Sequence, residues 1–261
     1  MPFVQAGNRR NYFFVALLVL MAVGVAVVHL GALGVLAVDP WLGIRVALDV
    51  VLFIMAVMGG RVIPMFTNNG VPGARARKHA MVERAALGSV LVLLAADAVQ
   101  APAWLMATLA VAAALAHGAR WWLWQPWKTV RVPLVAVLHA AYAWIPLHLL
   151  LRALAQAGVV PPSAAVHALT AGAVGGLVIG MITRTARGHT GRPLVADARD
   201  TACYLLVLGA ALVRVVGPLA LPQWSVGAVL VSAALWSAGF GLYAVCYWNV
   251  LTRARADGKP G

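Results

Sequence analysis

Long, mostly apolar stretches separated by short polar connections are the feature that most restricts the fold of this sequence. Each stretch is followed by a segment containing Gly, Pro, Asp or Gln. The eight stretches are Tyr12–Ala37, Trp41–Met58, Ala85–Val99, Ala103–Ala119, Val132–Leu151, Ala164–Ile182, Thr201–Leu221 and Val226–Leu251. Because a helix rises 1.5 Å per residue, about 20 apolar residues cross the hydrocarbon core of a bilayer. The pattern predicts an all-α, polytopic membrane bundle of about eight transmembrane helices, with residues 1–261 forming one transmembrane domain.

Composition excludes a soluble domain. Hydrophobic residues make up 63% of the chain and charged residues 10%, whereas soluble domains have about 45–50% and 25%. The net charge of +13 does not indicate nucleic-acid binding, because the basic residues lie between apolar stretches. The first stretch exceeds the 7–15 residue core of a signal peptide, so it is predicted to remain as a span. The lipid bilayer is therefore the expected partner.

The distribution of basic residues predicts the orientation of the bundle. Of the 20 Lys and Arg residues, all but Arg45, Arg152 and Arg214 lie in the two tails or after the second, fourth and sixth stretches. Cytoplasmic loops of membrane proteins are enriched in Lys and Arg. Both termini are therefore predicted to be cytoplasmic, which also requires an even number of spans.

Three histidines fall at similar depth in different predicted helices. Counting from the cytoplasmic helix ends at 1.5 Å per residue places His29 and His148 at roughly 26 Å, with His167 within a few ångströms of that level. Neutral imidazole is a common ligand of haem iron and copper. We therefore expect the three to converge on a metal or haem pocket near the outer face, although a helical histidine can also simply bond a neighbouring carbonyl.

Charged residues within the spans have two interpretations. Arg45 and Arg214 could neutralise haem propionates, because a guanidinium binds carboxylates in a bidentate manner. Alternatively, Arg45 pairs with Asp49 four residues later, and Asp97 pairs with Arg214 at a similar depth. Both alternatives follow from the cost of leaving a charge alone inside a membrane.

Other metal-binding side chains give weaker indications. His139 lies below the predicted histidine layer and could ligate a second centre, relay a proton or pack in the core. Copper could be held by thioethers or thiols, but core packing is favoured for these methionines and cysteines. No role is expected for His117. The sulfur-containing candidates are Met55, Met58, Met65, Cys203 and Cys246.

Several ordered motifs resemble those of the NnrS family of haem- and copper-containing membrane proteins, and the likeness covers nearly the whole chain. One is the Gly- and Pro-rich segment that we expect to form a loop after the second span. The motifs are Gly-Gly-Arg-Val-Ile-Pro-Met-Phe-Thr-Asn-Asn-Gly-Val-Pro at 59–72, Leu-His-Ala-Ala-Tyr at 138–142, His-Ala-Leu-Thr-Ala-Gly-Ala-Val-Gly-Gly at 167–176, Met-Ile-Thr-Arg at 181–184 and Gly-His-Thr-Gly-Arg-Pro-Leu at 188–194.

The resemblance implies a bacterial inner-membrane protein linked to nitric oxide, nitrosative stress and denitrification. Family members usually have about twelve helices, and this chain resembles the last eight, without the early histidine-rich part. If the early spans of the family hold a ligand, we expect this chain to bind fewer centres, to complete its site with a partner, or to be a degenerate copy. The residues that the resemblance carries over as cofactor-binding are His29, His139, His167, His189, Arg61 and Arg184.

His189 is expected in a Gly-rich cytoplasmic loop together with Arg184, Arg187 and Arg192. Such a cluster could hold an anion or a propionate. The positive-inside rule alone also accounts for the arginines.

Three functions are compatible with these features. The first is a haem protein, with copper as a further cofactor, that takes part in redox or gas-responsive chemistry. The second is a proton or small-solute transporter or channel that uses the intramembrane polar residues. The third is an assembly or interaction subunit of a larger respiratory membrane complex, or a homo-oligomer. No hydrolase motif or phosphate-binding loop is present.

Overall fold

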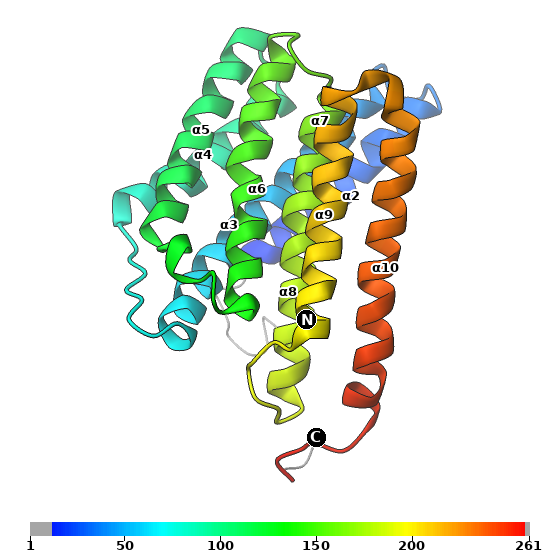
Figure 1. Ribbon diagram of the computed structural model, residues 1–261. Coiled ribbons are helices and arrows are strands. Elements are labelled where there is room, and N and C mark those ends of the chain that lie inside the picture. The colour runs from blue at the N-terminus through cyan, green and yellow to red at the C-terminus, as the bar shows by residue number, and fades with distance from the viewer. Residues whose placement is uncertain (1–11, 259–261) are drawn as a thin grey trace.

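A computed structural model of the protein describes residues 12–258 as helices joined by short connections (Figure 1). The α-helices are α2 (Tyr12–Ala32), α3 (Pro40–Gly70), α4 (Ala80–Ala98), α5 (Ala103–Leu123), α6 (Pro133–Gln156), α7 (Pro162–His167), α8 (Gly175–His189), α9 (Ala198–Ala220) and α10 (Ser225–Thr252). A π-helix, η3 (Ala168–Val174), joins α7 to α8, and η2 (Pro126–Lys128) and η4 (Pro222–Trp224) are short 3-10 turns.

The all-α membrane bundle predicted from the sequence is confirmed. Counting α7, η3 and α8 as one continuous rod, the described residues form eight rods. Seven of them are long and apolar enough to cross a membrane. The remaining rod is α4, whose 19 residues include Glu83, Arg84 and Asp97. Two of these charges are paired with arginines of neighbouring helices, as described below, so α4 fits inside the bundle despite its lower hydropathy.

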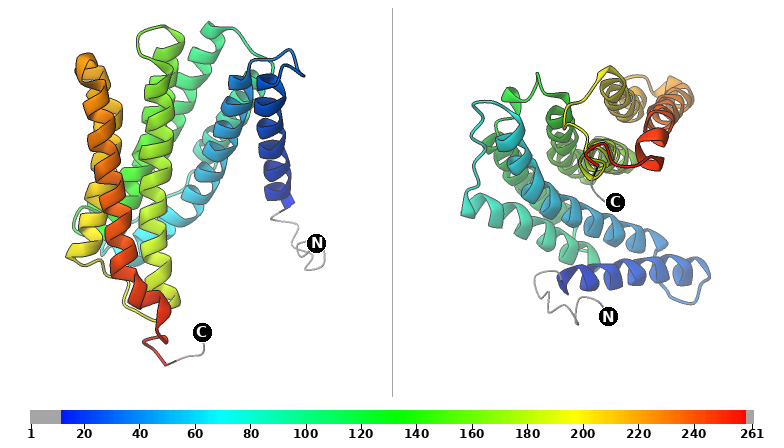
Figure 2. Two further views of the ribbon diagram at one scale, coloured as in Figure 1. Left: turned by 90° about the vertical axis from the view of Figure 1, so that its right-hand side faces the viewer. Right: turned by 90° about the horizontal axis from the view of Figure 1, so that it is seen from below.

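Helix α6 is the centre of the bundle. It contacts α3, α5, α7, η3, α8 and α9, and its side chains Leu138, Tyr142, Ile145 and Leu149 are completely buried. Helix α2 packs mainly on α3 and α10 mainly on α9, so both lie at the margin (Figure 2). The marginal helices expose apolar side chains, including Leu18 and Val19, as expected for surfaces that contact lipid tails.

Helix α2 begins and α10 ends at the same end of the bundle (Figure 2). We call this end the inner end and the opposite end the outer end. Helices α4, α6 and α9 also begin at the inner end, and α5 and α8 end there. The cytoplasmic location of the inner end remains a prediction from the basic residues.

Two helices extend further than the sequence suggested. Residues 59–70, expected in a loop, continue α3 through Gly59, Gly60 and Pro64. Both glycines are buried and lie against α5 and α6: a Cβ on Gly60 would overlap Arg120, and one on Gly59 would press on Tyr142. These interhelical contacts offset the low helix propensity of glycine and proline. Likewise, α8 continues to His189, which was expected in a loop.

Candidate functional site

The three histidines expected to share one layer do not meet. His29 is exposed on α2, at the margin of the bundle, whereas His148 is buried in α6. His167 ends α7 and lines a pocket against α9 and α10. Within residues 12–258, no three His, Cys, Asp or Glu side chains lie close enough to hold a metal ion together. The expected convergence was therefore wrong: counting residues gives the height of a side chain, but not which helices are neighbours or which way each face points.

His167 and Arg214 are brought together instead. They line a pocket of about 320 Å³ towards the outer end, which we call the outer pocket. Across residues 12–258, no carboxylate forms an ion pair with Arg214. The lining residues are His167, Thr170, Ala171, Arg214, Val229, Ser232, Ala233 and Trp236.

The π-helix η3 shapes one wall of the outer pocket. π-helical turns are rare and occur often at functional sites. Gly172 and Gly175 allow η3 and α8 to approach Trp144 and Trp236, because a Cβ at either position would overlap the indole. The hydroxyls in the pocket are already engaged: Thr170 donates to Val166 O at 2.9 Å, and Ser232 donates to Ala210 O at 2.8 Å. His167 and Arg214 are therefore the polar groups left to bind a ligand.

The outer pocket suits an anionic group with a large apolar surface. It supplies one imidazole and one guanidinium among apolar and aromatic side chains, so a haem in this pocket would be held by His167 as an imidazole ligand and by Arg214 as the partner of a propionate. It does not fit the ligand set of His29, His148 and His167 predicted from the sequence, because only His167 lies in the pocket.

A buried ion cluster joins α3, α4 and α6 on the same outer half. Arg152 donates from Nη1 to Asp49 Oδ1 at 2.6 Å and from Nη2 to Asp97 Oδ2. Arg45 Nε lies 3.9 Å from Asp97 Oδ1. The pairs Arg45–Asp49 and Asp97–Arg214 considered from the sequence are therefore wrong. Helix α6 carries Arg152 and lies between the acidic helices α3 and α4 on one side and α9 on the other. Arg152 of α6 therefore reaches both carboxylates, whereas Arg214 of α9 does not.

Two buried histidines of α6 each have one ring nitrogen without a hydrogen-bond partner among residues 12–258. His148 Nδ1 lies 2.7 Å from Ala165 O and therefore donates its proton there. Thr67 Oγ1 donates to Ile63 O at 2.8 Å, so it accepts from His139 Nε2, also at 2.8 Å. The remaining nitrogens, His148 Nε2 and His139 Nδ1, are buried lone-pair acceptors with no hydrogen-bond partner. In metal-ligating histidines, a hydrogen bond at one ring nitrogen typically fixes the tautomer in this way. Here the two hydrogen bonds go to different helices, since His139 bonds Thr67 of α3 and His148 bonds Ala165 of α7.

A second buried network lies nearer the inner end, centred on Arg120 of α5. Its guanidinium binds Glu83 through Nε at 2.8 Å and Nη2 at 2.5 Å. Its Nη1 also donates to Ala56 O at 2.7 Å and to Tyr142 Oη at 3.0 Å. Every acceptor in this network comes from a different helix, α3, α4 or α6, so Arg120 ties the four helices together.

His117 completes this network. Its Nε2 lies 3.0 Å from Ala86 O and donates there. Its Nδ1 accepts the proton of Tyr142 Oη at 2.8 Å. Arg120 stacks over Trp124, with its guanidinium carbon 5.2 Å from the ring centre. All polar atoms of the His117 ring are thus satisfied, which indicates a structural role for this residue.

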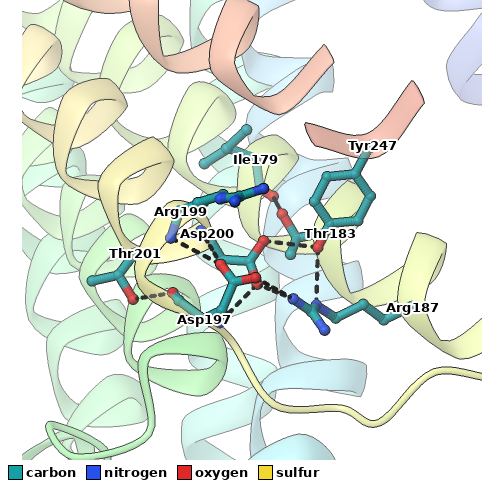
Figure 3. Close-up of polar contacts among 8 residues, drawn as sticks. All are labelled: Ile179, Thr183, Arg187, Asp197, Arg199, Asp200, Thr201 and Tyr247. Carbon is teal, nitrogen blue, oxygen red and sulfur yellow. Dashed lines mark hydrogen bonds and ion pairs between the residues drawn. The ribbon is translucent and has the colours of Figure 1, made fainter. Parts of the chain in front are cut away.

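The basic cluster expected around His189 is mostly engaged in helix contacts. Arg187 binds Asp200 at 2.5 Å and Tyr247 Oη at 2.9 Å, which joins α8, α9 and α10 (Figure 3). Arg184 stacks on Phe66 of α3, with its guanidinium carbon 3.7 Å from the ring centre. His189 is exposed at the end of α8. Arg187 has its counter-ion within the protein, so the three arginines do not form a free anion site.

Asp197 caps the amino end of α9. Its carboxylate accepts from the backbone N–H groups of Arg199 at 2.8 Å and Asp200 at 2.9 Å (Figure 3). These bonds hold the pKa of Asp197 below its usual value.

We expect Asp197→Ala to lower the free energy of unfolding by about 0.5–2 kcal/mol, the usual cost of removing such a cap. The wild type should lose this stabilisation as the pH falls through the lowered pKa, because the carboxylate accepts these bonds more strongly than the neutral acid does. Unfolding titrations of both proteins from neutral to acidic pH would test this. A difference between them that does not shrink in acid would contradict it.

Sequence reasoning missed Arg120, Glu83 and Arg152. Arg152 had a signal in the sequence, because Asp49 and Asp97 lie inside predicted spans, whereas Glu83 and Arg120 lie just outside theirs. Acidic residues number only 7, so each carboxylate inside a predicted span needs a basic partner at a matching depth. Arg120 was counted among the topology-determining basic residues and Arg152 was assigned no role, because a partner on another helix cannot be chosen without the packing.

Taken together, the fold and these intramembrane sites define a polytopic helical membrane protein with an open histidine–arginine pocket and two buried ion networks. A profile of the NnrS protein family matches residues 1–255. The chain therefore belongs to the NnrS family, as its motifs suggested. No curated protein and no solved structure matches it.

Proposed function

We propose that this protein binds haem in the outer pocket, with His167 as the imidazole ligand and Arg214 as the partner of a propionate, and that it acts in the response to nitric oxide. The haem would supply the redox-active or gas-binding centre. His167 and Arg214 would hold and orient it from α7 and α9. We further propose the bacterial inner membrane as its location.

The supporting observation is an unpaired arginine beside a histidine at membrane depth. Arg214 lies six residues before the end of α9, roughly 9 Å from that end. A charge at such a depth costs free energy unless something compensates it. Because no carboxylate in residues 12–258 pairs with Arg214, an anionic ligand in the outer pocket would supply the missing counter-charge.

The test is the absorption spectrum of the full chain purified from haem-replete cells. We expect a Soret band that is lost or reduced at least tenfold, per mole of protein, in His167→Ala. Arg214→Gln should weaken haem retention about tenfold, in line with the loss of a charge-assisted bond. His29→Ala is the matched control, because it removes an exposed histidine at a similar predicted depth, and its spectrum should not change.

Haem binding is contradicted if the wild type has no Soret band, or if His167→Ala retains the wild-type band. The nitric oxide role predicts a shift of the Soret band when nitric oxide is added to the reduced protein, and no shift would count against it. Copper binding is a separate proposal, for which we assign no ligand residues. Elemental analysis of the same purified sample tests it.

Transport of protons or a small solute is the second candidate, favoured by the buried cluster of Asp49, Asp97 and Arg152. It predicts flux into proteoliposomes that Asp97→Asn reduces while metal content stays the same. If the protein instead serves as an assembly subunit, it should copurify with a larger complex and show no flux.

A further inference from the structure

A second pocket lies at the inner end, between α2, α3, α4 and α5. Its volume is about 340 Å³. Its apolar lining, which we call the apolar wall, includes Phe13, Phe53 and Leu87, and its basic lining residues include Arg61 and Lys78. We call it the inner pocket. It shares no lining residue with the outer pocket.

The inner pocket carries uncompensated positive charge. Its acidic lining residue, Glu83, already has both carboxylate oxygens bound by Arg120. In the part of the chain that the structure describes, neither Arg61 nor Lys78 forms an ion pair. Arg61 instead lies over the ring of Phe13, with its guanidinium carbon 5.8 Å from the centre.

The position of Lys78 is fixed by the connection between α3 and α4. Asn68 bonds the backbone of Ala76 in both directions, accepting at 2.7 Å and donating at 3.1 Å. The backbone N–H of Arg75 donates to Gln125 Oε1 at 2.8 Å, and that of Arg77 donates to Leu123 O at 3.0 Å. The segment is thus attached to both α3 and the end of α5 immediately before Lys78.

The depth of the inner pocket matches the phosphate layer of a bilayer. Arg61 lies 21 residues after Pro40, the first residue of α3 at the outer end, so it is roughly 32 Å from that end along the helix. The hydrocarbon core is about 30 Å thick. Arg61 and Lys78 therefore lie where lipid phosphates are found, whereas the apolar wall extends towards the acyl chains.

From this combination of charge, apolar wall and depth, we propose that the inner pocket binds one anionic phospholipid. Arg61 and Lys78 hold its phosphate, and the wall formed by Phe13, Phe53 and Leu87 contacts its acyl chain. Basic pockets between transmembrane helices are known to bind lipid headgroups in this manner. A zwitterionic lipid has no net negative charge and binds more weakly.

The test is native mass spectrometry of the full chain released from nanodiscs containing phosphatidylglycerol and phosphatidylcholine in equal amounts. We expect one retained phosphatidylglycerol per protein. The double variant Arg61→Gln/Lys78→Gln should bind it about 30-fold more weakly, at about fivefold per basic residue. The control Arg199→Gln/Arg253→Gln removes two exposed charges from the same end outside the pocket and should change the affinity less than about threefold.

Two further measurements identify the ligand and exclude misfolding. Leu87→Trp fills the apolar wall without changing charge and should weaken phosphatidylglycerol binding about tenfold, while the thermal unfolding midpoints of all variants report the fold. Equal losses in the double variant and the control, or equal retention of both lipids by the wild type, would overturn the proposal. Inorganic phosphate that binds through Arg61 and Lys78 and is unaffected by Leu87→Trp would instead identify a free-anion site, which also overturns it.

Discussion

Arg120→Ala is expected to lower the free energy of unfolding by about 3–5 kcal/mol, which is the usual cost of removing one partner of a buried ion pair. The substitution leaves Glu83 without its counter-ion and Ala56 O without its donor. It also removes one of the two hydrogen bonds of Tyr142 Oη, the one in which that oxygen accepts from Arg120. It empties a site enclosed by Gly60 and Trp124 as well. We expect this to be one of the two largest single-residue effects in the bundle.

Equilibrium unfolding in mixed micelles of a mild detergent and dodecyl sulfate, followed by circular dichroism, would measure the loss. Arg84→Ala is the matched control, because Arg84 is exposed on α4 next to Glu83, and its loss should stay within about 0.5 kcal/mol. Glu83→Gln keeps an acceptor for Arg120 and should fall between the two. If Arg120→Ala were as stable as Arg84→Ala, the network would not be holding the four helices together.

Arg152→Leu is expected to have an effect of the same size, about 3–5 kcal/mol. It leaves the buried carboxylates of Asp49 and Asp97 facing each other on α3 and α4 without the guanidinium that joins them. Arg45 does not replace it, because its nearest approach to Asp97 is 3.9 Å and its side chain is 43% exposed. The same unfolding measurement applies.

A variant that removes all the buried charges of this cluster together would test whether the loss of stability comes from an unpaired charge. The triple variant Asp49→Asn/Asp97→Asn/Arg152→Leu removes all three buried charges together and should regain more than half of the lost stability, because no unpaired charge remains. Arg45→Leu is the control and should cost less than about 1 kcal/mol, as for an exposed pair. A triple variant no more stable than Arg152→Leu would show that the loss comes from packing rather than charge.

The sequence predicted the fold class well, because membrane spans are encoded locally. Each span needs a run of apolar residues matched to the bilayer thickness, and four of the eight predicted stretches lie entirely within helices, while the other four overrun a helix end by one to five residues. The misses were at helix ends. Gly59, Gly60 and Pro64 were interpreted as a loop because they weaken an isolated helix, whereas in the bundle the glycines allow Arg120 and Tyr142 to approach α3.

The candidate site was less predictable than the fold. His167 and Arg214 were both singled out from their residue type and depth, and they do share the outer pocket. His29 and His148 were singled out by the same reasoning and lie elsewhere. Depth restricts one coordinate of a side chain, whereas sharing a pocket also requires that its helix be a neighbour and that its face point inward.

What the sequence determined by itself is therefore the set of apolar helices, their alternation across the membrane and the residues that must avoid lipid. These depend on the hydrophobic effect and on local spacing, which act along the chain. Only the tertiary structure decided that Arg152 rather than Arg45 binds Asp49, that Arg120 binds Glu83, and that His167 faces Arg214. Each of these pairings joins residues on different helices, and the choice among several partners at similar depth is made by the packing of the helix faces around α6.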